Sequence, residues 1–259
     1  EATMKKGIYL TIITIITVIC IIGGSLYHLV NFLSFLPFHT TTSGSSTKEV
    51  ASSASEPLDA FQNIVADTDV ADITVCTGDD YSIDYQATTK LAPKYEVKNG
   101  TLTIQQTVKH TDKWGIGTPK RRCKITITIP AETSLDSIDI DGDVGDITVT
   151  GITSSKLVTD NAVGDTEIKQ CTIPSIETDS AVGDTDIIDC NFNKLDVDGD
   201  VGDITVQSKQ DLSDYKMECD TSIGEVSVNH HSHKDNYSQR GKAGTIILDN
   251  STGDISVSY

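Results

Sequence analysis

The heptapeptide DVGDITV at residues 143–149 decides the fold, because its Val-Gly-Asp core returns along the chain with a fixed spacing. Further copies, each 19 residues after the one before, stand at 163–165, 182–184 and 201–203. Two looser versions follow, Ile-Gly-Glu at 223–225 and Thr-Gly-Asp at 252–254. A period of about twenty residues is typical of stacked repeat proteins, in which each repeat buries its apolar side chains against the next.

The residues around each tripeptide alternate as they do in β-strands. Apolar side chains, Thr or Cys stand six and four positions before its first residue, and three and five positions after it. Such alternation marks a strand with one buried face, and most of these residues are β-branched, which favours pleated strands. The Gly between the strands can adopt the positive φ of a tight turn. Nineteen residues are too few for a strand–helix–strand unit, which needs about thirty.

We therefore predict an all-β fold, a two-stranded parallel β-solenoid with rungs of about 19 residues over 131–259. We expect Val144, Val163 and Val182 to lie over one another and to face the shared interior. Residues 58–130 keep the alternation without the period, and they contain the hairpin signal Asn-Gly at 99–100. We predict that this segment forms an irregular N-terminal β cap.

The N-terminal segment predicts a membrane anchor. Residues 8–30 carry no charged side chain, and a helix of that length, at about 1.5 Å per residue, crosses a bilayer. Lys5 and Lys6 precede it, so the positive-inside rule keeps the N-terminus in the cytoplasm and exports the rest. The apolar run is longer than a usual signal-peptide core and no Ala-x-Ala-like cleavage site follows it, which favours an uncleaved anchor.

The predicted organisation is accordingly a single-pass protein of the cell membrane with its C-terminal domain extracellular. The Ser- and Thr-rich segment after the anchor cannot bury enough surface to fold, which favours a flexible stalk. The five segments are a cytoplasmic N-terminus (1–7), a transmembrane signal-anchor (8–36), a stalk (37–57), the N-terminal β cap (58–130) and the β-solenoid repeats (131–259).

The charge of the chain lies on the repeats. Residues 131–259 hold 8 basic and 26 acidic side chains, a difference of -18, which equals the net charge of the whole chain. Phosphate contacts need a basic surface, so we expect no binding to nucleic acid.

The carboxylates of the tripeptides should form a ladder along one edge of the solenoid. At a strand spacing of about 4.8 Å, neighbouring charges repel by roughly 0.9 kcal/mol in water, so something must offset the repulsion. Each carboxylate could cap N–H groups of its own turn, or the ladder could bind calcium, as Asp-rich solenoid turns do. We expect no cofactor, with calcium as the alternative. The candidate metal ligands are Asp146, Asp165, Asp184 and Asp203.

A basic segment in the cap is a candidate for surface contact. Basic residues gather around the one Trp of the chain. The candidates for surface contact are this residue, Trp114, and the three basic residues Lys120, Arg121 and Arg122. The segment is either a solvated hairpin tip or a contact with an anionic surface, such as lipid headgroups or a phosphate-bearing wall polymer.

Two further features bear on chemistry. Cys171 and Cys190 are 19 residues apart, so they occupy one position of neighbouring rungs, either as stacked core side chains or as a disulfide. No nucleophile–His–acid order and no phosphate loop occurs in the sequence, so we expect the protein not to be an enzyme.

The repeat pattern Leu-x-Val-x-x-x-x-Gly-Asp-Ile-x-Val at 195–206 resembles the bacterial domain-of-unknown-function family labelled putative adhesin. It is also similar to the envelope-stress proteins of Gram-positive bacteria that carry Gly-Asp repeats. The resemblance covers about residues 61–259 and implies a β-solenoid without catalytic residues. It implies a membrane-anchored binding or scaffolding module of the cell envelope, with an envelope protein or a wall polymer as partner. The alternatives are a cation-binding structural rod and, third, a polysaccharide-active enzyme.

Overall fold

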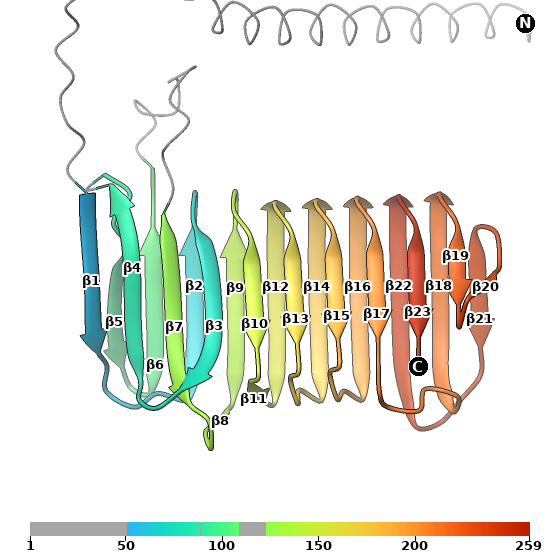
Figure 1. Cartoon of the computed structure of the whole chain (residues 1–259), viewed down its shortest axis with the longest axis horizontal. Coiled ribbons are helices and arrows are strands. Elements are labelled where there is room, and N and C mark those ends of the chain that lie inside the picture. The colour runs from blue at the N-terminus through green and yellow to red at the C-terminus, as the bar shows by residue number, and fades with distance from the viewer. Residues whose placement is uncertain (1–50, 89, 109–122) are drawn as a thin grey trace, which may run out of the picture. The chain divides into compact units, whose positions relative to one another are not determined.

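The computed structural model describes residues 51–88, 90–108 and 123–259, which belong to one compact unit. Every regular element within these ranges is a β-strand (Figure 1), so the all-β prediction is confirmed. None of the described segments forms a helix that is long and apolar enough to cross a membrane. The predicted signal-anchor at 8–36 and the basic segment around Trp114 lie outside the described residues.

Two large sheets enclose the core. Sheet A follows the order β1 (Ala51–Pro57), β4 (Ser82–Thr88), β7 (Lys124–Pro130), β3 (Asp72–Gly78), β10 (Ile147–Thr150), β13 (Thr166–Lys169), β15 (Thr185–Ile188), β17 (Ile204–Gln207), β23 (Ile255–Ser258), β19 (Val226–Val228) and β20 (His231–Ser232). Sheet B follows the order β21 (Asn236–Gln239), β18 (Tyr215–Ile223), β22 (Gly244–Thr252), β16 (Lys194–Val201), β14 (Ser175–Val182), β12 (Lys156–Val163), β9 (Ser137–Gly142), β2 (Asn63–Thr68), β6 (Thr101–Gln106) and β5 (Lys94–Lys98).

Each coil of the repeat contributes one strand to each sheet, and neighbouring coils pair in parallel. Residues 19 apart stand in register, as Leu157 does with Ile176 in sheet B and Ile168 with Ile187 in sheet A. This register confirms the parallel β-solenoid. A short third ladder, which the two-stranded description leaves out, pairs β8 (Ser134–Leu135) with β11 (Thr153–Ser154) and continues through single bridges.

The interior holds the four positions that the alternation predicted, and they are buried in all six repeats. In one coil they are Leu157, Thr159, Thr166 and Ile168, each at most 1% exposed. A buried Leu or Ile side chain contributes about 2 kcal/mol when it leaves water. The two strands of one coil leave these side chains open toward the coils on either side, so each coil depends on its two neighbours.

The two cysteines in register are free core thiols. Cys171 and Cys190 are both buried, and neither forms a disulfide. The Cys190 thiol donates to the carbonyl oxygen of Ile168 at 3.3 Å, and the Cys171 thiol to that of Lys169 at 3.2 Å. The thiols therefore act as small stacked core side chains.

The prediction that the tripeptide valines face the interior was wrong. Val163 and Val182 do stand in register, but they are 46% and 47% exposed. The cause is a break in the alternation: the pairing between β12 and β14 skips Ala162 and Ala181, where the chain leaves the sheet for the turn. The last interior place of the strand belongs to Asn161, which is fully buried.

At the C-terminal side, the order of the coils in space differs from their order in sequence. The last coil, β22 and β23, lies between β16 and β18 in sheet B and between β17 and β19 in sheet A. The coil of β18 and β19 is therefore the outermost one (Figure 1). The insertion at 229–243 supplies β20 and β21, which pair antiparallel with this outer coil and cover its edge.

The N-terminal side repeats this arrangement. The coil of β2 and β3 lies between that of β6 and β7 and that of β9 and β10, and β4, β5 and β1 add antiparallel strands outside. The segment predicted as an irregular cap, 58–130, therefore contains two coils of the parallel stack as well as edge strands. The end of the predicted stalk is also different, because Ala51–Pro57 is the strand β1. Backbone hydrogen bonds to β4 hold this edge strand, and they need no apolar side chains.

The turns between the strands stack so closely that only glycine fits. Gly183 has a φ of 149°, and a Cβ on it would lie 2.0 Å from the carbonyl oxygen of Gly164 in the coil below. Gly164 meets Gly145 in the same way. Both the backbone conformation and the close approach thus require the Gly of the repeat.

We expect Gly183→Ala to lower the free energy of unfolding by at least about 3 kcal/mol, because the turn must shift against its neighbour. Urea unfolding measures this change. Val182→Ala is the matched control at the preceding, half-exposed residue, with an expected loss below about 1 kcal/mol. Equal losses in the two variants would contradict the close stacking of the turns.

Candidate functional site

The outer face of sheet B carries a column of seven aspartates, which we call the sheet ladder. Each stands three residues before the first residue of its turn, and each is exposed. The pairing of the strands puts them in direct register from coil to coil. In spatial order they are Asp67, Asp141, Asp160, Asp179, Asp198, Asp249 and Asp220.

Within the described ranges the sheet ladder has no compensating cations, whereas three of the four acidic residues in the column before it do, Asp139 being the exception. Glu177, Asp196 and Glu218 lie two residues before ladder positions, and each pairs with a lysine of the next column. The pairs are Lys156–Glu177 at 3.5 Å, Lys194–Asp196 at 2.9 Å and Lys216–Glu218 at 3.0 Å. Among the described residues, none forms an ion pair with an aspartate of the sheet ladder.

At three of the seven positions, the surroundings of the carboxylate raise its pKa and so disfavour its charged form. Although the side chains are exposed, their neighbours exclude part of the solvent, and this desolvation is the largest cause that raises the pKa of Asp179 above 3.8. The charges of Asp198 and Asp160 on either side raise it further. The pKa values of Asp141 and Asp249 are raised for the same reasons. Repulsion between like charges therefore acts at these three positions of the sheet ladder.

The four predicted metal ligands form a second column, the turn ladder, in which each carboxylate binds the backbone of the next coil. The backbone N–H of Asp165 donates to Oδ1 of Asp146 at 3.1 Å, and that of Asp184 donates to Oδ1 of Asp165 at 3.0 Å. Asp203 continues the series by donating to Asp184 at 2.8 Å. Further members extend the series at both ends: Asp72, Asp254 and Glu225.

This arrangement corrects the expectation that each aspartate caps its own turn. The N–H of Gly164 donates to the carbonyl of Val182, and the N–H of Thr166 donates to the carbonyl of Asp184, so the strand ladder satisfies both. The N–H of Asp165, between them, finds its acceptor on the side chain of the coil below. No three His, Cys, Asp or Glu side chains within the described ranges are placed to hold a metal ion. Calcium at these carboxylates stays a prediction.

The exposed valines separate the two ladders. The chain places Val163 three residues after Asp160 of the sheet ladder and two residues before Asp165 of the turn ladder. Val201 is 49% exposed and continues this column, and Ile223 of the outermost coil is 69% exposed. One edge of the stack thus presents an apolar column between two acidic ones.

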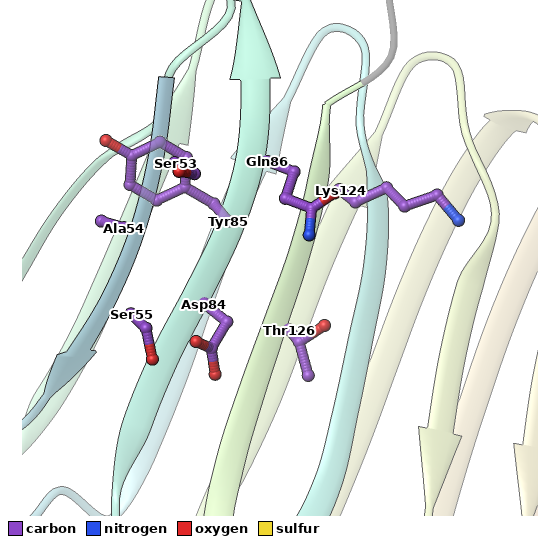
Figure 2. A pocket seen from close by; sticks show the side chains of 8 residues that line it. All are labelled: Ser53, Ala54, Ser55, Asp84, Tyr85, Gln86, Lys124 and Thr126. Atoms are coloured by element: carbon purple, nitrogen blue, oxygen red, sulfur yellow. The ribbon is translucent and has the colours of Figure 1, made fainter. Parts of the chain in front are cut away.

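Sheet A carries a shallow depression of about 320 Å³ on its face near β1, β4 and β7 (Figure 2). Asp84, Ser55 and Thr126 lie side by side across the three strands, and the side chain of Lys124 extends away from Asp84 toward β3. Lys124 Nζ lies 3.9 Å from the carboxylate of Asp72. The lining contains hydroxyl, amide and single charged groups but no histidine or cysteine.

The candidates for surface contact, Trp114, Lys120, Arg121 and Arg122, lie outside the described residues, so contact with an anionic surface stays a prediction. The sheet ladder was missed from the sequence, although Asp141, Asp160, Asp179 and Asp198 recur every 19 residues. The same period that located the turns would have located this column.

Comparison with known proteins identifies a family. The model described as Toastrack DUF4097 matches residues 61–259. No curated protein matches the chain.

Three solved structures show a distant likeness to this chain. One is a putative cell adhesion protein from Clostridium sporogenes, with 14% identity and a TM-score of 0.47, covering 81% of this chain and 99% of that chain. Another is a putative adhesin from Bacteroides fragilis, with 15% identity and a TM-score of 0.34, covering 82% and 98%. A putative lipid binding protein from Parabacteroides distasonis has 15% identity and a TM-score of 0.35, covering 80% and 96%. At such values, none of these likenesses indicates what this chain binds.

The turn ladder predicts that Asp165→Ala lowers the free energy of unfolding by about 1 kcal/mol, because the N–H of Asp184 loses its acceptor. Asp165→Asn keeps an oxygen acceptor and should stay close to the native value. Amide hydrogen exchange at Asp184 should accelerate in the Ala variant alone. If the Asn variant is as unstable as the Ala variant, the charge matters and the hydrogen bond does not.

The sheet ladder predicts that Asp179→Asn raises the free energy of unfolding, whereas Asp165→Ala in the turn ladder lowers it. Because the pKa of Asp179 is raised in the folded state, the folded protein binds this proton more tightly than the unfolded chain does. Stability therefore increases as the pH falls through the raised pKa, and the increase is complete below the ordinary value of 3.8. At pH 7, Asp179→Asn should stabilise by about 1 kcal/mol at low salt, since it removes repulsion from two neighbours.

Urea unfolding at pH 7 and pH 4 measures both parts of this prediction, and the stabilisation should shrink at the lower pH. Asp136→Asn, an exposed acid outside both ladders, is the control and should change little. A destabilised Asp179→Asn protein at pH 7 would mean that the carboxylate makes a favourable contact.

Proposed function

Because the chain belongs to the Toastrack DUF4097 family, whose model covers residues 61–259, we propose that it is a non-enzymatic binding or scaffolding module of the cell envelope. The match confirms the family resemblance of the Gly-Asp repeats. In this proposal, residues 8–36 anchor the chain in the cell membrane and the repeats lie outside the cell. The module presents the outer face of sheet B to a basic protein of the envelope.

The sheet ladder is the observation that carries this proposal. Seven aspartates stand in register without an ion pair to any described residue, while three of the four acidic residues in the neighbouring column, Glu177, Asp196 and Glu218, each have a lysine. The like charges destabilise the folded protein, and a partner with basic side chains would relieve that repulsion on binding. Local rules of stability are typically broken at functional sites.

The geometry favours a partner that contacts several coils at once. Strand spacing fixes the carboxylates at intervals of about 4.8 Å on a rigid sheet. Each exposed ion pair contributes little by itself, but a row of them adds up and steers association. A phosphate-bearing wall polymer would be repelled by this face, so the envelope protein is the favoured one of the two expected partners.

Octalysine is a suitable probe for the face, and calorimetry on the full chain measures its binding at low and at physiological salt. We expect binding at low salt that weakens steeply with added salt. The double variant Asp160→Asn/Asp179→Asn should weaken binding roughly tenfold at low salt, since it removes two adjacent charges from the centre of the ladder.

The double variant Asp136→Asn/Asp214→Asn changes the net charge equally but leaves the sheet ladder intact, so it serves as the matched control. Its binding should stay within about twofold of the native value. Equal weakening in the two double variants would reduce the effect to net charge and overturn the assignment of the site.

A further inference from the structure

A polar column runs through the interior of the stack, at the position two residues before the first residue of each turn. Its members face one another from coil to coil and are buried, which is unusual for polar side chains in a β core. In spatial order they are Gln106, Thr68, Gly142, Asn161, Ser180, Gly199, Asn250 and Thr221.

The asparagines of this column hold the carbonyl groups of the turns. Nδ2 of Asn161 donates to the carbonyl oxygens of Gly145 at 3.2 Å and Gly164 at 3.0 Å, so it bridges two coils. Nδ2 of Asn250 donates to the carbonyl oxygen of Gly202 at 2.8 Å. Because a carbonyl oxygen only accepts, these contacts fix the amide orientation and direct each Oδ1 into the interior.

Both of these Oδ1 atoms are buried without a hydrogen-bond partner, and so are the nearest hydroxyls of the column. The unpartnered atoms are Asn161 Oδ1, Thr68 Oγ1, Asn250 Oδ1 and Ser180 Oγ. A buried polar atom without a partner costs about 1–3 kcal/mol, and such atoms are rare in native proteins. With Nε2 of Gln106 at the end of the column, five such atoms lie in one column, and the four that flank glycines call for a common explanation.

A glycine separates the unpartnered atoms in each of two places. Gly142 lies between Thr68 and Asn161, and a methyl group on it would lie 3.5 Å from Asn161 Oδ1 and 3.8 Å from Thr68 Oγ1. These are ordinary contact distances, so the missing side chain leaves a notch lined by polar atoms. Ile147 Cδ1, at 3.7 Å, is the apolar wall.

A similar but narrower notch lies three coils away. Gly199 stands between Ser180 and Asn250, and a methyl group on it would lie 3.1 Å from Asn250 Oδ1, which is closer than ordinary van der Waals contact. Here the carbonyl oxygen of Gly183 also accepts no hydrogen bond from the described residues. A side chain like that of Asn161 would supply this donor, but the column has only glycine at that place.

We propose that each notch binds one structural water molecule. The water donates one hydrogen to the Asn Oδ1 and makes a second hydrogen bond to the facing hydroxyl, of Thr68 in one notch and Ser180 in the other. At Gly199 its other hydrogen goes to the carbonyl oxygen of Gly183. Buried waters in proteins typically make about three hydrogen bonds to polar groups that lack partners, whereas purely apolar notches stay dry. The two waters thus continue, through the glycine positions, the row of donors that Asn161 and Asn250 supply elsewhere.

Substitution of Gly142 tests the water site at that notch, because a bound water and a dry notch predict stability changes of opposite sign. The backbone of Gly142 has no positive φ, so a side chain is accommodated without strain. With the water present, Gly142→Ala displaces it and leaves two polar atoms unpartnered, which should raise the equilibrium constant for unfolding about tenfold. In Gly142→Ser the hydroxyl takes the place of the water, so the constant should stay within about threefold of the native value.

A dry notch predicts the reverse. Gly142→Ala would then stabilise the protein, because alanine lowers the entropy of the unfolded chain and fills space, and serine would be no better than alanine. Urea unfolding of the full chain distinguishes the two cases. A crystal structure of the native protein should show a solvent peak within hydrogen-bond distance of Asn161 Oδ1 and Thr68 Oγ1, and a dry notch there would overturn the proposal.

Discussion

The close stacking of the turns is the constraint on which the rest of the structure depends. The carbonyl oxygen of each turn glycine occupies the place that a Cβ of the next turn would take, as Gly164 and Gly183 show. Coils held at this distance have no freedom to slip, because a shift by one residue would exchange the inner and outer faces of every strand. Side chains one period apart are therefore forced into columns. The core, the two acidic ladders and the internal polar column all follow from this register.

The same stacking explains why the repeat retains Asp beside Gly. Within the turn, the N–H of Asp165 and the carbonyl of Gly164 are left out of the strand ladder, and side chains complete both. The carboxylate of Asp146 accepts from the first on the outside, and the amide of Asn161 donates to the second on the inside. The turn ladder thus has a structural role in every coil. The sheet ladder has no such partner among the described residues, and this difference is the reason why the proposed function assigns binding to it.

The sequence was sufficient to predict the period, the strand alternation and the buried positions such as Leu157 and Ile168, because these depend only on local spacing. It could not predict that the coil of β22 and β23 lies inside that of β18 and β19, since all coils present equivalent apolar positions and any two can stack. The alternation rule failed at Val163, where the strand ends and the chain bends. The pattern of four apolar positions also left out Asn161, whose partners are backbone groups that only the stacked turns bring near.

The displaced coils have a consequence for what the module can bind. A solenoid that ended on its last coil would offer an open parallel edge, which is a template for pairing with another chain. Here the C-terminal coil is enclosed on both sides, and the outer coil is covered by the short antiparallel strands β20 and β21. At the other end β5 places Lys94 and Lys98 on the edge of sheet B, where charged side chains disfavour further pairing. At these edges growth by strand addition is disfavoured, and in the proposed function recognition falls to the long faces, of which sheet B carries the sheet ladder.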